Sequence, residues 1–233
     1  MEAILLAGGK AERLGDAAAG KPKPLVPVAG RPLAAHQVAQ LVRAGVDRVI
    51  VSCAAGQDGA FAQELSGLGA EIVTVPEPEP LGRGGGIRFA AEQRRESGPV
   101  FALNGDELLD LDPRALLAHH RKLGAAATIV VSPLVSPFGI VEVDDGDLVT
   151  GFEESPRLPH WVNAGFYVLD DEALARFPRR GDHETSTFPE LAAERRLAVF
   201  RHKGVWLTVN TPKQLRIAGD YLTANPDWLA GRR

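Results

Sequence analysis

The chain has 233 residues, of which 45% are hydrophobic and 24% are charged, and its formal net charge is −4. This length and hydrophobic content predict one globular domain with an ample core. The acidic balance argues against a broad nucleic-acid-binding face. No apolar stretch approaches the ~20 residues that a membrane-spanning helix needs. Cys53 is the only cysteine, so the chain has no internal disulfide, and its position after an apolar run predicts a buried thiol.

The N-terminus has neither the basic segment nor the small-residue cleavage site of a signal peptide, so we expect a cytoplasmic enzyme. We expect neither a nucleic acid nor a membrane as a partner, and the sequence is compatible with a homo-oligomer. The first 31 residues are locally basic, which suits a small anionic ligand. Their basic residues are Lys10, Arg13, Lys21, Lys23 and Arg31.

The first 106 residues alternate short apolar runs with amphipathic stretches. Buried strands are predicted at 3–6, 48–52, 71–75 and 99–103, and helices at 33–44, 57–65 and 82–95. This alternation predicts an α/β fold, with a parallel sheet and helices on both of its faces. Ligands then bind at the carboxyl ends of the strands. The loops at 8–9, 76–86 and 104–106 each follow a predicted strand, so we expect them on one edge of the sheet.

The pattern changes after residue 106. Strands are predicted at 126–131, 139–143, 148–152, 162–169 and 197–201, with a hairpin turn at 144–147. Helices are predicted at 113–123, 185–195 and 211–222; Asp112 caps the first, and Thr211 and Pro212 begin the last. His119 and His120 are expected on an exposed helix face. No internal repeat or linker divides the chain.

A double glycine follows the first predicted strand. Gly8 and Gly9 let main-chain N–H groups approach phosphate oxygens. Arg13, Lys21 and Lys23 follow and can neutralise phosphate charge. The glycines alone would indicate only a tight turn, but together with these basic residues they predict a polyphosphate site.

Asp106 comes directly after the strand predicted at 99–103, behind Asn104 and Gly105. A carboxylate at this position can hold Mg²⁺ beside bound phosphates. A lone aspartate in a turn is more often a cap, but the phosphate loop on the same edge favours the metal. The glycine-rich stretch at 76–86 is equally compatible with contact to a planar base and with an ordinary rigid loop.

The order of these features resembles that of the sugar-1-phosphate nucleotidyltransferases, also called nucleotide-sugar pyrophosphorylases, from residue 1 to about 222. The segments that carry the resemblance are Gly8-Gly9-Lys10-Ala11-Glu12-Arg13-Leu14, Lys23-Pro24, Pro80-Leu81-Gly82-Arg83-Gly84-Gly85, Gly105-Asp106, Glu154-Ser155-Pro156, Asn163-Ala164-Gly165 and Trp206-Leu207-Thr208-Val209-Asn210-Thr211-Pro212. In this family the corresponding stretches read G-G-x-G-T-R-L, K-P, P-L-G-T-G-G, G-D, E-K-P, N-A-G, and W-x-D-x-G-T or V-N-T-P.

The resemblance implies a Rossmann-like, mixed and mainly parallel sheet in a single domain, 1–233. An NTP-binding half at 1–106 would be followed by a sugar-phosphate-binding half at 107–222. The substrates would be an NTP and a sugar 1-phosphate, with Mg²⁺ as the cofactor, and in-line attack at the α-phosphorus would release pyrophosphate. The 80–85 stretch looks most like that of short bacterial enzymes that activate mannose-type or heptose phosphates with GTP. Related short groups use UTP or dTTP.

The resemblance also implies a role for individual residues. The catalytic residues would be Arg13, Lys23 and Asp106. The nucleotide-binding residues would be Leu6, Ala7, Gly8, Gly9, Glu77 and Gly82. The sugar-binding residues would be Asn104, Gly139, Glu154, Asn163 and Gly165. The metal ligands would be Asp106 and Asn210.

The chain departs from the family pattern at three places. Ala and Glu at 11–12 replace Gly and Thr of the phosphate loop. Ser155 replaces a lysine that meets the sugar phosphate in the family, and Arg157 or another basic residue would have to compensate. Thr208 stands where many members have a second metal-binding Asp. We therefore expect Asn210 as the metal ligand, the alternative being that it caps the helix that follows.

These departures motivate an alternative, a regulatory paralogue that binds a nucleotide sugar without making one. The presence of Arg13, Lys23 and Asp106 argues against it, because a chain relieved of catalysis has no need of all three. An NAD-binding Rossmann protein is a further alternative. The loop at 8–9 lacks the G-x-G-x-x-G spacing, and the second strand ends without the ribose-binding acid, so we set this alternative aside.

Overall fold

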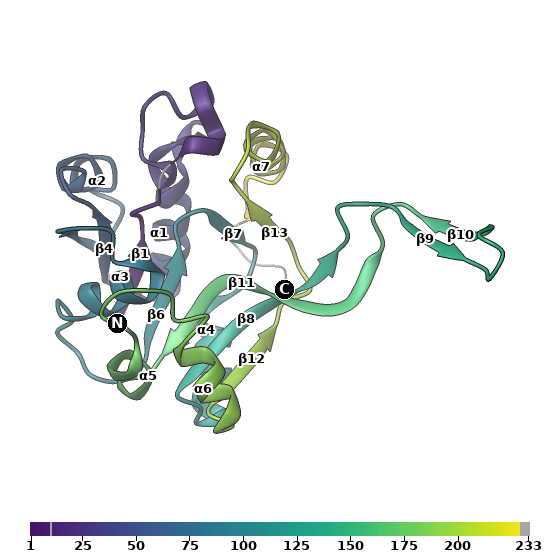
Figure 1. Cartoon of the computed structure of the whole chain (residues 1–233). Coiled ribbons are helices and arrows are strands. Elements are labelled where there is room, and N and C mark those ends of the chain that lie inside the picture. The colour runs from purple at the N-terminus through teal and green to yellow at the C-terminus, as the bar shows by residue number, and fades with distance from the viewer. Residues whose placement is uncertain (10, 229–233) are drawn as a thin grey trace.

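The computed structural model describes residues 1–9 and 11–228; Lys10 and residues 229–233, all part of the expected 1–233 domain, lie outside the described residues. Within the described part, the largest sheet has seven strands in the order β12-β8-β11-β6-β1-β4-β5 (Figure 1). Their bounds are β1 Glu2–Leu6, β4 Arg48–Ala54, β5 Glu71–Glu77, β6 Val100–Asn104, β8 Ala127–Val135, β11 Arg157–Leu169 and β12 Leu197–Arg201.

The sheet is mixed and mainly parallel. β1 runs parallel to β4 and β6, β4 to β5, and β8 to β12, whereas β11 runs antiparallel to both β6 and β8. Leu6, at the end of β1, lies opposite Ser52 of β4 and Asn104 of β6. The loops that follow these strands therefore share one edge of the sheet, as the sequence predicts.

Helices cover both faces of the sheet. One face carries α1 (Leu33–Arg43), α2 (Asp58–Glu64) and α4 (Pro113–Leu123), and the other carries α3 (Gly82–Ala91), α5 (Asp171–Arg176) and α6 (Thr187–Ala193). Side chains of β1 alternate between the two cores, as a strand's period of two requires: Ala3 and Leu5 join one, and Ile4 the other. The predicted Rossmann-like α/β fold is confirmed.

A third apolar cluster joins the two ends of the chain. Ala218 and Leu222 of α7 (Pro212–Ala224) pack with Leu14 and Val28 near the N-terminus. Thr211 caps α7, its hydroxyl accepting the N–H of Gln214 at 3.3 Å, as the sequence predicts. The cluster brings the turn before α7 close to residues 12–18, so that Arg13 contacts Asn210. The short elements around it are η1 Glu12–Ala18, η2 Lys23–Leu25, β2 Pro27–Val28, β3 Arg31–Pro32, β7 Glu107–Leu109 and β13 Trp206–Thr208.

A two-stranded antiparallel ribbon projects from the body (Figure 1). It consists of β9 (Ile140–Val143) and β10 (Val149–Glu153), joined by the predicted turn, in which Asp144 Oδ1 accepts the N–H groups of Gly146 and Leu148. The cross-strand pairs Val141–Phe152 and Val143–Val149 put four apolar side chains on one face. All four are exposed. We call residues 140–153 the ribbon.

Two expectations about single side chains have different outcomes. Cys53 is fully buried as expected, and burial raises the pKa of its thiol to about 11. The expectation of an exposed His120 is wrong. This ring is buried; its Nδ1 lies 2.9 Å from the Thr128 hydroxyl and its Nε2 lies 3.3 Å from Asp170, because that side of α4 packs against the sheet. Among the described helices, none is long and apolar enough to cross a membrane.

Candidate active site

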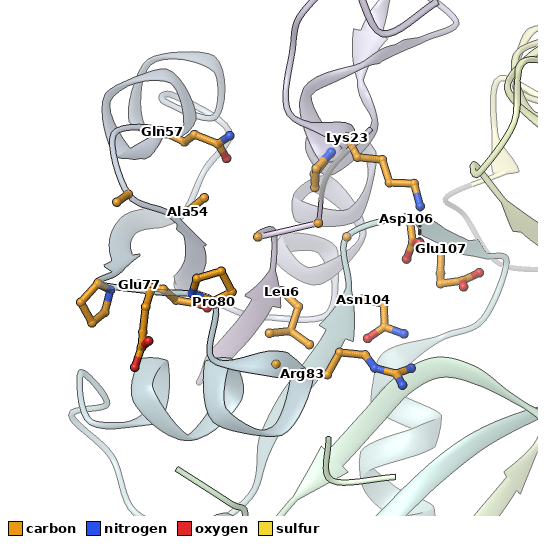
Figure 2. Close-up of a pocket in the computed structure, with 18 residues that line it drawn as sticks. Leu6, Lys23, Ala54, Gln57, Glu77, Pro80, Arg83, Asn104, Asp106 and Glu107 are labelled. Atoms are coloured by element: carbon orange, nitrogen blue, oxygen red, sulfur yellow. Dashed lines mark hydrogen bonds and ion pairs between the residues drawn. The ribbon is translucent and has the colours of Figure 1, made fainter. Parts of the chain in front are cut away.

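A cavity of about 680 Å³ opens at the carboxyl edge of the sheet. Its walls are formed by the segments that follow β1, β4, β5 and β6, and Figure 2 shows Lys23, Asp106, Asn104 and Glu107 along one side of it. The expected site residues that line the cavity are Leu6, Gly8, Gly9, Lys23, Glu77, Gly82, Asn104 and Asp106.

Four side chains from distant parts of the chain meet at one end of the cavity. Lys23 Nζ donates to Asp106 Oδ2 at 2.7 Å and to Asn210 Oδ1. Arg13 Nη2 donates to the same Asn210 oxygen at 3.1 Å. Lys23 is 83 residues from Asp106 and 187 from Asn210 in the sequence. We call Arg13, Lys23, Asp106 and Asn210 the Asp106 centre.

The backbone around Asp106 is held on several sides. Gly105 N–H donates to the carbonyl of Leu6 at 2.9 Å. A Cβ at Gly105 would lie 2.5 Å from that oxygen and 2.7 Å from Pro24 Cγ, so this close approach requires glycine. The Gln37 amide donates to the carbonyls of Asn104 and Glu107 at 2.8 and 2.7 Å. These contacts fix the direction in which the Asp106 carboxylate points.

The donor set of the Asp106 centre fits a magnesium ion. The Lys23 ammonium, itself a cation, contacts one carboxylate oxygen of Asp106 and the amide oxygen of Asn210, so these two oxygens converge on a single positive charge. Oxygen ligands of this kind are those that Mg²⁺ prefers, often together with substrate phosphates. Thr208 instead pairs with Glu107 in the β13–β7 ladder. No cluster of three or more His, Cys, Asp or Glu in the described chain could hold a metal by itself.

The glycines at the start of α3 allow a neighbouring backbone segment to approach the helix closely. A Cβ at Gly82, whose φ is +77°, would lie 2.8 Å from the carbonyl of Gly181. A Cβ at Gly84 would lie 2.7 Å from the backbone nitrogen of His183. Glu77 holds the preceding turn: its carboxylate accepts the Ser52 hydroxyl at 2.7 Å and the Leu81 N–H at 3.0 Å. The glycine-rich stretch therefore seats α3 against residues 179–183.

Three of the expected sugar-binding residues lie together. Asn163 Oδ1 accepts the N–H of Gly165 at 2.9 Å, and Gly165 has a φ of +70°. A Cβ at Gly165 would lie 2.6 Å from Asn104 Nδ2. The Asn163 amide also donates to Glu184 Oε1 at 2.8 Å. We call Asn104, Asn163, Gly165 and Glu184 the sugar wall.

The other two expected sugar-binding residues lie at the base of the ribbon. A Cβ at Gly139 would be 2.9 Å from Glu154 Oε2 and 2.5 Å from the Phe152 ring, so Gly139 and Glu154 are neighbours. Neither belongs to the lining of the cavity. Ser155, in the place of the family's lysine, follows Glu154 with a φ of +50°. Ala7 is fully buried, its N–H donating to the carbonyl of Ser52 at 2.7 Å.

Glu107 and Arg83 are among the cavity-lining residues that the sequence did not predict for the site. Glu107 lines the cavity and accepts the Trp206 indole N–H at 2.7 Å; burial and the neighbouring Asp106 raise the pKa of its carboxyl to about 9. Its position beside Asp106 was the available signal. Arg83 also lines the cavity and pairs with Asp182 at 3.0 Å and with Glu184. Its signal was a charged residue where the family pattern has threonine.

The sequence pattern of the nucleotidyl transferase family matches residues 2–225. The chain belongs to the nucleotidyl transferase family. It is 32% identical over 251 residues to the mannose-1-phosphate guanylyltransferase catalytic subunit beta of Xenopus tropicalis, across 98% of this chain and 68% of that protein. It is also 32% identical over 243 residues to the mannose-1-phosphate guanylyltransferase of Mycobacterium tuberculosis, across 99% of this chain and 65% of that protein. These matches confirm the resemblance and the class of enzyme.

Solved structures share the fold at lower identity. HddC from Yersinia pseudotuberculosis superposes with a TM-score of 0.73 at 22% identity, over 95% of this chain and 99% of that chain. A putative glucose-1-phosphate thymidylyltransferase from Bacillus anthracis superposes with a TM-score of 0.76 at 17% identity, over the full length of both chains. These likenesses support the fold class read from the sheet order.

Proposed function

We propose that this nucleotidyl transferase joins GTP to a mannose-type sugar 1-phosphate, giving a GDP-sugar and pyrophosphate, with Mg²⁺ as cofactor. The observation that carries the proposal is the Asp106 centre, which puts two cations, a carboxylate and an amide oxygen beside the cavity that Gly8 and Gly9 line. The choice of GTP and of a mannose-type sugar is supported by the names of the two relatives at 32% identity.

The reaction we propose is an in-line displacement. An oxygen of the sugar 1-phosphate forms a bond to the α-phosphorus of the triphosphate, and the bond from that phosphorus to the bridging oxygen of the β-phosphate breaks. Negative charge builds on the leaving pyrophosphate, and the Lys23 and Arg13 cations stabilise it. Positioning and charge neutralisation supply the rate, so no covalent enzyme intermediate is needed.

Asp106 and Asn210 would hold the Mg²⁺, which supplies neutralisation of phosphate charge when it is bound. Lys23 keeps the oxygens of these two residues together from a buried position. The bound triphosphate would offer further oxygen ligands, in keeping with a site that contains a single carboxylate.

The remaining expected residues divide into those that would hold the nucleotide and those that would hold the sugar. Leu6, Ala7, Gly8, Gly9, Glu77 and Gly82 would hold the nucleotide. Asn104, Asn163 and Gly165 of the sugar wall would hold sugar hydroxyls, together with Gly139 and Glu154 at the base of the ribbon. Side-chain amides and a carboxylate are suited to this task because each hydroxyl both donates and accepts hydrogen bonds.

The test is a pyrophosphate-release assay of ATP, CTP, GTP, UTP and dTTP against a panel of sugar 1-phosphates with Mg²⁺ present. We expect the highest kcat/KM with GTP and a mannose-type or heptose-type phosphate. Turnover with UTP or dTTP instead would overturn the nucleotide assignment and keep the reaction. Tight binding of a nucleotide sugar with no turnover in any pair would overturn the reaction and favour the regulatory paralogue.

A further inference from the structure

Arg83 joins the two sides of the cavity. It is the second residue of α3, and its guanidinium lies on the side of the cavity where Figure 2 shows Asn104 and Glu107. One Nη pairs with Asp182 at 3.0 Å and the other pairs with Glu184. The backbone N–H of Arg83 also donates to Asp182 at 2.9 Å. The arginine is therefore held at both its backbone and its side chain by the segment that precedes α6.

The contact continues from Glu184 into the sugar wall. One Glu184 oxygen takes the Arg83 guanidinium and the other accepts the Asn163 amide at 2.8 Å. Asn163 in turn accepts the N–H of Gly165, whose φ of +70° sets the bend of β11 beside Asn104. A continuous series of polar contacts thus runs from the first turn of α3, on the nucleotide side, to Asn163 and Gly165 on the sugar side.

The positive charge of Arg83 also affects the groups around it. Burial raises the pKa of the Tyr167 hydroxyl, and the Glu184 and Glu107 carboxylates raise it further, whereas Arg83 opposes them. Among the described residues that line the cavity, the cations are Lys23 and Arg83, and Lys23 is already engaged in the Asp106 centre. Arg83 forms the ion pair that holds the Glu184 carboxylate beside Asn163.

The residue that begins this series of contacts differs from the family pattern. Arg83 occupies the position of threonine in the P-L-G-T-G-G pattern of the family that the chain resembles. A threonine side chain is uncharged and ends two bonds from Cα, so it cannot reach two carboxylates at once. Arginine can, because its planar fork has five N–H donors and a permanent charge.

We infer that Arg83 is a positioning residue for the sugar substrate: it fixes Glu184, and through Glu184 it sets the orientation of Asn163. Recognition of the sugar then depends on a side chain from the nucleotide side of the cavity. The inference deepens the proposed function and rests on it for the kinetic part of its test.

The kinetic test compares Arg83→Thr, Arg83→Lys and a matched control, Arg176→Thr. Arg176 is also held by two carboxylates, Glu172 at 3.0 Å and Glu194 at 2.6 Å, but it lies on α5 and does not line the cavity. We expect Arg83→Thr to raise the KM for the sugar 1-phosphate about tenfold, with the KM for the NTP and kcat within about twofold. Arg83→Lys should recover part of the loss, and the control should match the parent chain. A rise in the NTP KM alone would overturn the inference.

A double-variant cycle separates positioning from direct contact with the substrate. If Arg83 acts through Glu184, then Glu184→Gln should have a similar effect, and adding Arg83→Thr to it should change the sugar KM by less than about twofold. Effects that multiply would overturn the inference in favour of direct contact between Arg83 and the sugar phosphate.

A crystal structure of the Arg83→Thr variant tests the inference without turnover. We expect the Glu184 and Asn163 side chains to leave the positions they hold in the parent chain. Unchanged positions would overturn the inference even if the enzyme is active. Absence of turnover by the parent chain would count against the proposed function alone, because this structural comparison still decides the role of Arg83.

Discussion

Under the proposed function, the Asp106 centre and two residues at the base of the ribbon, Gly139 and Glu154, contact substrate, but the fold holds the two regions differently. The centre joins side chains up to 197 residues apart through direct hydrogen bonds, and Lys23 within it is buried. The ribbon consists of two strands with exposed apolar residues such as Val143 and Phe152, 63% and 68% exposed. A two-stranded hairpin has little stability of its own in water. The groups that we propose for phosphate are therefore pre-arranged by tertiary contacts, whereas Gly139 and Glu154 lie beside each other next to Phe152 of the ribbon.

This contrast predicts a division of labour. Changes in the Asp106 centre should affect the chemical step and the metal requirement, because these groups face developing charge. Changes at the base of the ribbon should affect the binding of sugar, with small effects on stability.

The largest effect should follow from Asp106→Asn. The substitution keeps the shape of the side chain but removes the carboxylate charge from the metal and phosphate site, so kcat should fall by about 10²-fold or more. The measurement is pyrophosphate release at saturating substrates. Asp112→Asn is the control, since asparagine caps the helix at 113–123 as well as aspartate does. Activity of Asp106→Asn close to that of this control would contradict the assignment.

Stability should be sensitive to a single added methyl group where α3 packs against residues 179–183. Gly84→Ala would place a Cβ 2.7 Å from the backbone nitrogen of His183, so the free energy of unfolding should fall by about 2 kcal/mol. Gly59→Ala, in α2 with open space around it, should raise that free energy by about 0.5–1 kcal/mol. On the ribbon, Val143→Thr should change it by less than about 0.5 kcal/mol. Urea denaturation of the three variants measures these differences, and equal effects of the two glycine substitutions would contradict the packing argument.

The metal ligand can be assigned by comparing Asn210→Ala with Thr208→Ala. Loss of the Asn210 amide oxygen should raise the Mg²⁺ concentration for half-maximal activity by about tenfold. Asn210→Asp should restore tight metal dependence, because a carboxylate oxygen takes the place of the amide oxygen. A Mg²⁺ titration of each variant makes the measurement. A shift in Thr208→Ala with none in Asn210→Ala would assign the site to Thr208.

The smallest of these effects on activity should come from the base of the ribbon. Glu154→Gln keeps one acceptor oxygen and removes the charge, so the KM for the sugar 1-phosphate should rise about fivefold, the loss of one hydrogen bond of ordinary strength. The KM for the NTP should stay unchanged. Steady-state kinetics with each substrate varied in turn gives both values. A larger rise in the KM for the NTP than in the KM for the sugar 1-phosphate would contradict the assignment of Glu154 to the sugar.

The sheet could be predicted from the sequence because its strands are continuous apolar runs that end in glycine or polar loops. β1, β4 and β6 lie within two residues of their predicted bounds. The short β7–β13 pair was not predicted, since three residues of each strand give no periodic signal. His120 was misplaced because two adjacent histidines look polar, whereas α4 turns one of them toward Thr128 and Asp170.

The site was predictable in part. The positions of Lys23 and Asp106 follow from the family resemblance, and the structure brings their side chains together. The contacts of Arg83 with Asp182 and Glu184 were not predictable, because no local pattern relates residues about a hundred positions apart. From the sequence, the glycine-rich stretch that contains Arg83 is equally compatible with contact to a planar base and with an ordinary rigid loop. Gly84 in particular is needed because the backbone of residues 179–183 lies against it.

The claim that nucleotidyl transfer takes place at the Asp106 centre is tested most directly by a crystal structure of the chain with GTP and Mn²⁺ in place of Mg²⁺. The anomalous signal of manganese locates the metal independently of the surrounding atoms. We predict a peak within coordination distance of Asp106 Oδ2 and Asn210 Oδ1, with triphosphate oxygens completing the shell. A peak that lies away from Asp106, in a complex that contains the nucleotide, would contradict the account.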